Sequence, residues 1–305
     1  MPDLTRIHLG PQPDPTLTSA ITVAGAELVD LDQAEAVVWV GGPGDFPKLP
    51  DAVRWVQLGS AGVESWFAAG VIDDRRIWTS ATGAYGPTVA EHTVALLLAG
   101  VRALQEQIRA TRWDRDEIEP HVGTLRGATV AIVGAGGIGR AMVSMLTALG
   151  ADVLAVNRSG RQVPGAIETW TSDRTAEVWG RADHVVIAAP ATSDTAHLVG
   201  TEQLAAMKPT AWLVNIARGS LVDSDALVAA LASGQIAGAA LDVTDPEPLP
   251  DGHPLWDLPN AIITPHVANP TAVQGPLLAE HIAGNVRRFV AGEALESVID
   301  RGRGY

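Results

Sequence analysis

Three separate segments of the chain carry side chains whose chemistry suits a small organic acid. Arg218 follows an apolar run, Glu247 stands between two prolines, and His266 follows a second apolar run that ends in Thr-Pro. A guanidinium binds carboxylate and carbonyl oxygens with two parallel donors, and an imidazole exchanges a proton near neutral pH. A carboxylate beside the imidazole would orient the ring and stabilise the imidazolium. The three groups predict a site for hydride transfer to a 2-keto acid, with Arg218, Glu247 and His266 as catalytic residues.

Each of these residues also has a structural interpretation when it is taken alone. Arg218 is equally explained as a surface ion-pair partner, Glu247 as a carboxylate in a turn, and His266 as a buried histidine with its hydrogen bonds satisfied. All three follow expected strands, and ligands of open parallel sheets bind at the carboxyl ends of the strands. We therefore favour the joint interpretation as an active site.

A glycine-rich turn is the second chemical signal. The apolar run 131–133 leads into the segment 134–139, which reads G-x-G-x-x-G between an expected strand and an expected helix. These glycines permit a tight turn, close approach of a pyrophosphate, and close packing of the helix on the strand, and the helix N-terminus adds unpaired N–H groups. We predict dinucleotide binding, the alternative being a turn that binds nothing. The expected contacts are Gly134, Gly136, Gly137, Ile138 and Gly139.

The end of the next expected strand, 152–156, indicates which dinucleotide binds. NAD sites usually place an acidic residue here to bind the ribose 2′-hydroxyl, but this chain has Asn157, Arg158 and Ser159. Arg158 can pair with a 2′-phosphate and Ser159 can donate to it, and the missing carboxylate removes a repulsion. We favour NADP(H) over NAD(H), with a solvated loop arginine as the alternative role of Arg158.

The order of apolar runs and helical patterns predicts parallel sheets in both halves of the chain. We predict two doubly wound parallel-sheet α/β domains with the substrate between them. The first is a discontinuous flavodoxin-like substrate domain, residues 1–93 and 270–305, and the second is a Rossmann cofactor domain, residues 94–269. The expected strands are 37–40, 53–58, 77–79, 128–133, 152–156, 183–188, 211–216, 239–243 and 261–264, and the longer helices are 89–104, capped by Thr88, then 138–149 and 271–291.

Composition excludes several classes of protein. The length of 305 residues, with 47% hydrophobic and 18% charged residues, suits two globular domains. The net charge of −14 argues against nucleic acid as a partner and weakly against anionic membranes. The chain has no cysteine, so disulfides and cysteine-bound zinc are excluded, and we assign no residue to a metal. Neither a signal peptide nor a membrane span is recognisable, so we expect a cytoplasmic protein.

Longer motifs resemble the D-isomer-specific 2-hydroxyacid dehydrogenase family. The stretch 207–219, Met-Lys-Pro-Thr-Ala-Trp-Leu-Val-Asn-Ile-Ala-Arg-Gly, is similar to the long signature of that family. The stretch 238–243, Gly-Ala-Ala-Leu-Asp-Val, leads to Glu-Pro-Leu-Pro at 247–250 in the same way, and His253–Trp256 and Thr264–His266 follow in the expected order. The resemblance covers nearly the whole chain. It implies a member similar to glyoxylate/hydroxypyruvate reductases or phosphoglycerate dehydrogenases, without a regulatory domain.

The resemblance implies the catalytic set named above and adds further contacts. It implies that Asp242 contacts the nicotinamide carboxamide and that the N–H groups of the loop Ser60, Ala61 and Gly62 bind the substrate carboxylate, which suits such a loop physically. It also implies that Thr88 passes the nicotinamide at a hinge and that the protein is a homodimer. Further cofactor contacts are expected from Pro190, Thr195 and Ala217.

The sequence departs from the family pattern outside the catalytic set. Glu64 stands near the first glycine loop where aspartate is common, Ala189 precedes Pro190 where histidine is common, and residues 83–87 replace an asparagine-containing approach to the hinge. These departures leave open which 2-keto acid is bound.

Two further side chains receive weaker interpretations. We interpret His92 as structural because it lies on a mostly apolar helix. For Trp113 the resemblance implies a tryptophan that reaches the active site of a second subunit; the alternative is an aromatic of an interface or surface.

Alternatives to a glyoxylate or hydroxypyruvate reductase remain. Phosphoglycerate or formate oxidation uses the same scaffold, and a corepressor-like sensor would bind the dinucleotide without turnover. The intact set of Arg218, Glu247 and His266 argues against the sensor.

Overall fold

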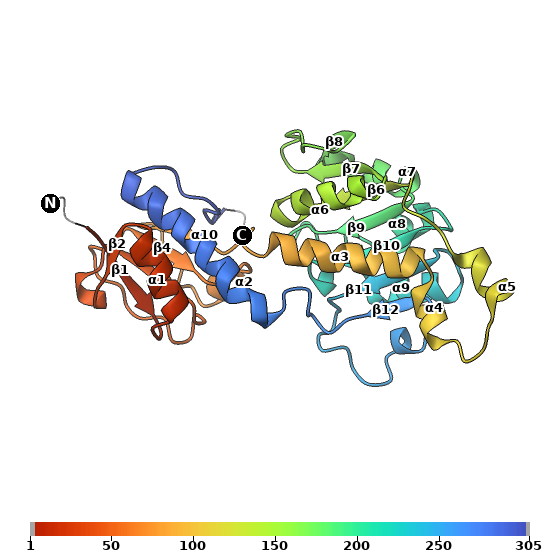
Figure 1. The fold of residues 1–305 in the computed structure, drawn as a ribbon, viewed down its shortest axis with the longest axis horizontal. Coiled ribbons are helices and arrows are strands. Elements are labelled where there is room, and N and C mark those ends of the chain that lie inside the picture. The colour runs from red at the N-terminus through yellow and green to blue at the C-terminus, as the bar shows by residue number, and fades with distance from the viewer. Residues whose placement is uncertain (1–3, 303–305) are drawn as a thin grey trace. The chain divides into compact units, whose positions relative to one another are not determined.

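The computed structural model describes residues 4–302, so the outer ends of the predicted first domain, residues 1–3 and 303–305, lie outside it. The chain forms two compact units: one runs to Tyr85 and resumes at Pro270, and the other runs from Gly86 to Asn269. Each unit contains a parallel sheet (Figure 1). This confirms the predicted class of two parallel-sheet α/β domains. No helix within residues 4–302 is long and apolar enough to cross a membrane.

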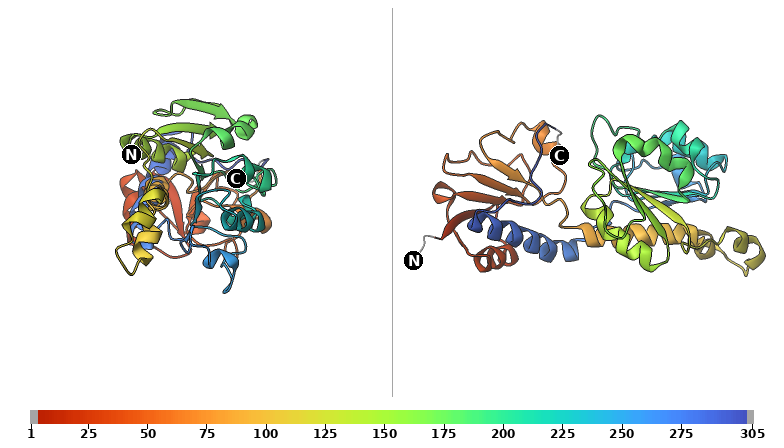
Figure 2. Two further views of the ribbon diagram at one scale, coloured as in Figure 1. Left: turned by 90° about the vertical axis from the view of Figure 1, so that its right-hand side faces the viewer. Right: turned by 90° about the horizontal axis from the view of Figure 1, so that it is seen from above.

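The first unit has a five-stranded sheet in the order β2-β1-β3-β4-β5, which is the flavodoxin-like order. Helices α1 and α10 pack together on one face (Figure 2) and bury Ile282 and Val286 against strand residues such as Ile7 and Trp55. The elements are β1 (Thr5–Gly10), α1 (Pro15–Val23), β2 (Ala26–Leu28), β3 (Ala36–Trp39), β4 (Trp55–Leu58), α2 (Glu64–Ala68), β5 (Ile77–Thr79) and α10 (Thr271–Ala291).

The second unit has a seven-stranded parallel sheet in the order β12-β11-β10-β9-β6-β7-β8. This is the Rossmann order with one additional strand, β12. Its strands are β6 (Thr129–Val133), β7 (Asp152–Asn157), β8 (Glu168–Thr171), β9 (His184–Ile187), β10 (Trp212–Asn215), β11 (Gly238–Leu241) and β12 (Ala261–Ile263). Its helices are α3 (Gly86–Val101), α4 (Leu104–Arg109), α5 (Arg115–Ile118), α6 (Gly137–Ala148), α7 (Val178–Arg181), α8 (Thr201–Ala206) and α9 (Ser224–Ala232).

Helices cover both faces of this second sheet. Helices α3 and α6 pack against each other on one face (Figure 2). On the other face Val178, Leu204 and Leu227, from α7, α8 and α9, pack on strand residues such as Leu213. Because both faces are covered, the central strands are apolar runs without the alternation of a half-exposed sheet.

One histidine is built into this core as a neutral acceptor. Burial lowers the pKa of His184 to about 4, so its ring is uncharged near neutral pH. The N–H of Trp212 donates to the Nδ1 atom of His184 at 3.2 Å. The ring thereby satisfies a backbone donor between β9 and β10.

The predicted helix 89–104 is wrong at both ends. Helix α3 begins at Gly86, so Thr88 lies inside its first turn and is not its cap. Pro87 does not delay the start, because the first turn of a helix needs no N–H from the proline. The helix ends at Val101, and Ala103, with a φ of 51°, separates it from α4.

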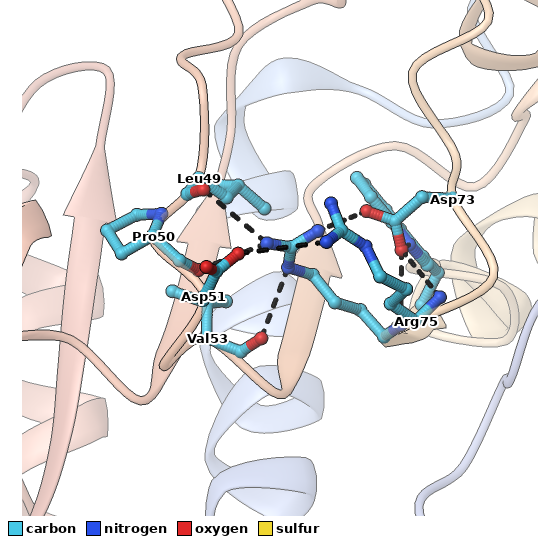
Figure 3. A network of polar contacts seen from close by, with 8 residues as sticks. Leu49, Pro50, Asp51, Val53, Asp73 and Arg75 are labelled. Carbon is cyan, nitrogen blue, oxygen red and sulfur yellow. Dashed lines mark hydrogen bonds and ion pairs between the residues drawn. The ribbon is translucent and has the colours of Figure 1, made fainter.

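A buried guanidinium holds together the loops at one end of the first sheet (Figure 3). The side chain of Arg76 is 6% exposed and forms an ion pair with Asp73. It also donates to the carbonyl oxygens of Val53 at 3.1 Å and Pro50 at 3.0 Å. Burial raises the pKa of Asp73, but hydrogen bonds and the charge of Arg76 outweigh it, so the pKa is lowered.

We expect Arg76→Met to destabilise the protein by about 3 kcal/mol, because it removes the ion-pair partner of a partly buried carboxylate and a donor to two carbonyl oxygens. Arg75→Met is the matched control. Arg75 and its partner Asp51 are 70% and 95% exposed, so its loss changes the free energy of unfolding by less than about 0.5 kcal/mol. Urea denaturation measures both variants, and equal effects would contradict a structural role for the buried network.

Candidate active site

Three neighbouring strands of the second unit end at the same edge of the sheet. The parallel register pairs Asn215 of β10 with Leu241 of β11, and Leu241 with Ile263 of β12. Arg218, Glu247 and His266 follow these three strands within a few residues. The carboxyl edge of such a sheet is where ligands bind. The three predicted catalytic residues therefore emerge from adjacent loops on one edge.

The structure brings Glu247 and His266 into direct contact. The Nδ1 atom of His266 lies 2.7 Å from the Oε1 atom of Glu247. An ionised carboxylate only accepts hydrogen bonds, so Nδ1 carries a hydrogen and donates. The contact fixes the orientation of the ring and leaves Nε2 as the nitrogen that can exchange a proton with a substrate.

The turn that carries Arg218 is fixed by a buried asparagine. The Asn215 side chain is fully buried, donates to the Arg218 carbonyl oxygen at 2.9 Å and accepts from the Ala217 N–H at 3.1 Å. The next residue, Gly219, packs against backbone: a Cβ atom there would lie 1.9 Å from the Thr244 carbonyl oxygen. The turn of Arg218 therefore abuts the segment that leads to Glu247.

A second buried polar residue, Asp242, holds the segment that carries His266. Its carbonyl oxygen accepts from the His266 N–H at 2.9 Å. Its carboxylate, in a residue 2% exposed, accepts from the N–H groups of Val267 at 3.0 Å and Ala268 at 3.1 Å. His266 has a φ of 53°, a conformation that non-glycine residues adopt at a cost. These bonds keep His266 in that conformation.

The glycine turn lies where the strand order reverses, between β6 and β9. Gly134 has a φ of 101°, and a Cβ atom there would lie 2.3 Å from the Ala189 nitrogen, so only glycine fits. By contrast, a Cβ atom at Gly136 would have no other atom within 4 Å. The turn is thus closely packed at Gly134 and open at Gly136, the glycine expected to lie next to a pyrophosphate.

These features fit a dinucleotide. The open position at Gly136 immediately precedes α6, a helix of 12 residues, and the first N–H groups of a helix have no partner within it. Gly137, Ile138 and Gly139 form this first turn. Backbone donors and the positive end of the helix would hold the phosphates there.

Two loops that flank the glycine turn are closed by their own hydrogen bonds. After β7, the Asn157 side chain donates to the Arg161 carbonyl oxygen at 2.8 Å, and Ser159 donates to Asn157 at 3.2 Å. After β9, the Thr195 hydroxyl donates to the Pro190 carbonyl oxygen at 2.7 Å. These hydrogen bonds fix the backbone of both loops, which carry predicted cofactor residues, including Arg158.

Other predicted residues lie elsewhere in the two units. Thr88 lies in α3, where its hydroxyl donates to Asn269 at 3.3 Å. The loop Ser60–Gly62 follows β4 in the first unit. There the hydroxyl of Ser60 is buried and has no hydrogen-bond partner within residues 4–302. No group of acidic and histidine side chains in the described part of the chain could hold a metal ion.

Sequence reasoning missed two residues that support this edge. Asn215 was visible only as part of the long signature, and nothing local indicated that its side chain fixes the Arg218 turn. His92 was interpreted as structural, yet its Nε2 atom lies 3.1 Å from Thr264 Oγ1 and 3.3 Å from Asp242 Oδ1. No sequence pattern links His92 to Thr264, because the two residues are 172 positions apart.

Comparison with known proteins gives consistent matches. Residues 93–268 match the family "D-isomer specific 2-hydroxyacid dehydrogenase, NAD binding domain". A glyoxylate/hydroxypyruvate reductase B of Pectobacterium carotovorum is 32% identical over 88% of this chain and 87% of its own. An uncharacterized protein of Corynebacterium melassecola is 43% identical over 94% and 96%. The crystal structure of a D-isomer specific 2-hydroxyacid dehydrogenase from Xanthobacter autotrophicus, complexed with NADPH and MES, has a TM-score of 0.81 and 27% identity, covering 99% and 100%.

Alanine substitutions should separate the two glycines of the turn. Gly136→Ala should cost only about 1 kcal/mol of stability, because the space is open, although its φ of −82° and ψ of −143° are sparsely populated by alanine. Its methyl group should weaken NADPH binding at least about tenfold, which is ~1.4 kcal/mol, by filling the place predicted for the pyrophosphate. Thermal unfolding and fluorescence titration with NADPH measure the two effects.

Gly134→Ala serves as the contrasting variant. Its left-handed backbone and the nearby Ala189 nitrogen should lower the unfolding temperature markedly. A Gly136→Ala protein that unfolds early but binds NADPH normally would contradict the assigned roles.

Proposed function

Since the chain belongs to the D-isomer specific 2-hydroxyacid dehydrogenases, we propose that it is an NADP(H)-dependent reductase of small 2-keto acids such as glyoxylate and hydroxypyruvate. The observation that carries the proposal is the 2.7 Å contact between His266 Nδ1 and Glu247 Oε1 at the carboxyl edge of the sheet. A histidine held by a carboxylate in this way is suited to transfer protons. The likeness to a glyoxylate/hydroxypyruvate reductase supports the substrate class.

In the proposed reaction the protein controls the proton and the charges. Hydride comes from the reduced nicotinamide when it is bound. His266, protonated on both nitrogens, donates the Nε2 proton to the carbonyl oxygen as that oxygen gains negative charge. Glu247 stays hydrogen-bonded to Nδ1 and complements the positive charge of the ring. Arg218 holds the carboxylate and carbonyl oxygens of the substrate through its planar guanidinium.

The preference for NADP(H) rests on the loop after β7. Its residues include Arg158 and Arg161 and no carboxylate between positions 157 and 161. The Ser159 hydroxyl accepts from the Arg161 N–H at 3.2 Å, so the loop is internally closed before any ligand binds. A preformed loop with two arginines suits a 2′-phosphate, because less ordering is needed on binding.

The remaining assignments of the sequence are part of the same proposal. The buried, unpartnered hydroxyl of Ser60 supports the loop Ser60–Gly62 as the site of the substrate carboxylate. Contact of Asp242 with the nicotinamide carboxamide, cofactor contacts of Thr88, Pro190, Thr195 and Ala217, the homodimer and the cytoplasmic location stay predictions.

We expect His266→Gln to lower kcat for reduction of glyoxylate and hydroxypyruvate by about 10²- to 10⁴-fold, because the proton donor is lost. The dissociation constant of NADPH should change less than about threefold, since a side-chain change at His266 leaves the glycine turn intact. Steady-state rates at 340 nm and fluorescence titration measure both quantities.

The substrate panel for this test includes 3-phosphohydroxypyruvate as well as formate with NADP⁺. Preferred turnover of either would replace the proposed substrate class. Tight NADPH binding by the wild-type protein with no turnover of any of these compounds would contradict the proposed enzyme and favour a dinucleotide sensor.

Arg158→Ala should reduce kcat/KM for NADPH by about 10- to 100-fold, since a charge-assisted hydrogen bond contributes roughly 1.5–3 kcal/mol. The value for NADH should change little, because NADH has no 2′-phosphate. Arg126→Ala is the control, since Arg126 is an exposed arginine of the same unit that precedes β6 at the amino edge of the sheet. An unchanged NADPH/NADH ratio in Arg158→Ala would refute the assignment.

A further inference from the structure

The carboxylate of Asp242 accepts three hydrogen bonds and has an imidazole beside it. The N–H groups of Val267 and Ala268 reach it at 3.0 and 3.1 Å, and the Thr264 hydroxyl reaches Oδ1 at 2.5 Å. The imidazole of His92 is close by, with its Nε2 atom 3.3 Å from the same Oδ1, and it is hydrogen-bonded to Thr264. The three donors come from the segment around His266. His92 alone comes from a different element, helix α3.

The directions of these bonds assign the hydrogen on His92. The Thr264 hydroxyl gives its proton to Asp242, so its oxygen can only accept from His92 Nε2 at 3.1 Å. The Asp242 carboxylate is also only an acceptor when ionised. Both neighbours of Nε2 therefore require a donor, and Nε2 carries the hydrogen. This N–H is donated to the threonine oxygen and lies close to the carboxylate.

Helix α3, which carries His92, packs closely on the sheet. It packs on β10 and β11, the strands that precede Arg218 and Asp242. The approach is close: a Cβ atom at Gly100 would lie 2.3 Å from the Trp212 ring of β10. A side chain on a helix so closely docked is fixed relative to the strand ends, as a precise site requires.

We propose that His92 is a positioning residue for the proton donor. Its Nε2–H bonds to Thr264, whose hydroxyl bonds to Asp242. Asp242 in turn holds the N–H groups of 266–268 and with them the left-handed backbone of His266. His92 does not touch the reacting atoms. This inference rests on the proposed function, in which His266 gives the proton.

His92→Phe removes the donor and keeps a planar ring, whereas His92→Gln keeps an N–H donor near the position of Nε2. We expect His92→Phe to lower kcat for 2-keto acid reduction by about 10- to 100-fold, as misplaced catalytic groups do, with KM for the keto acid changed less than about twofold because Arg218 is unaffected. His92→Gln should recover kcat to within about threefold of wild type. The primary kinetic isotope effect with 4-deuterated NADPH should increase in His92→Phe, as the chemical step becomes slower.

Thr93→Val is the matched control. Thr93 is the next residue of α3 and its hydroxyl donates to the Val89 carbonyl oxygen within the helix at 2.6 Å. Thr93→Val removes a buried polar group from the same turn of the helix without touching Asp242, so kcat and the isotope effect should stay at wild-type values. A fall in kcat in Thr93→Val equal to that in His92→Phe would reduce His92 to a helix-stabilising residue and overturn the proposal.

Hydrogen exchange of the Val267 and Ala268 amides gives a readout that needs no turnover. Both amides should exchange faster in His92→Phe and at the wild-type rate in His92→Gln. Unchanged exchange, or a kcat equally low in both variants, would overturn the proposal for His92. Absence of turnover in the wild-type protein would instead overturn the proposed function, while the exchange rates would still show whether His92 holds the segment.

Discussion

The parallel register of β10, β11 and β12 is the constraint on which the candidate site depends. Asn215, Leu241 and Ile263 are paired across these strands, so three loops leave the sheet at one level. Parallel strands require a crossover for each return of the chain, which is why residues far apart in the sequence reach one edge. The helices that cover both faces fix the strands. The loops that follow these strands can therefore carry polar side chains at fixed positions.

Two costly features of this edge stabilise one another. A buried carboxylate is unfavourable unless donors surround it, and a left-handed backbone at a histidine costs about 1–3 kcal/mol. Asp242 meets the first condition with donors from the segment that follows His266. The same bonds keep His266 in its strained conformation. Each feature stabilises the other, so the geometry of the proposed proton donor is tied to the burial of Asp242.

The sequence predicted the parts of the molecule whose signals are local. Buried parallel strands appear as short apolar runs, and the glycine turn has a fixed spacing between a strand and a helix, so the fold class and this turn could be recognised. The bounds of helix α3 could not be recognised from the sequence. Pro87 is compatible with a first helical turn and gives no sharp start. Ala103 adopts a φ of 51°, and alanine has no intrinsic preference for that conformation.

Contacts between distant segments were beyond the reach of local patterns. His92 stands on an apolar helix, and from the sequence its polar ring needs only some partner, which made a structural interpretation sufficient. The partner proves to be Thr264, 172 positions away, beside the carboxylate that holds His266. The same is true of Arg76, whose acceptors Val53 and Pro50 lie 23 and 26 positions before it. Whether a buried polar side chain serves stability alone or also a site depends on what its partner holds. The partner of such a side chain depends on how its helix packs on the sheet, and the local sequence does not show this packing.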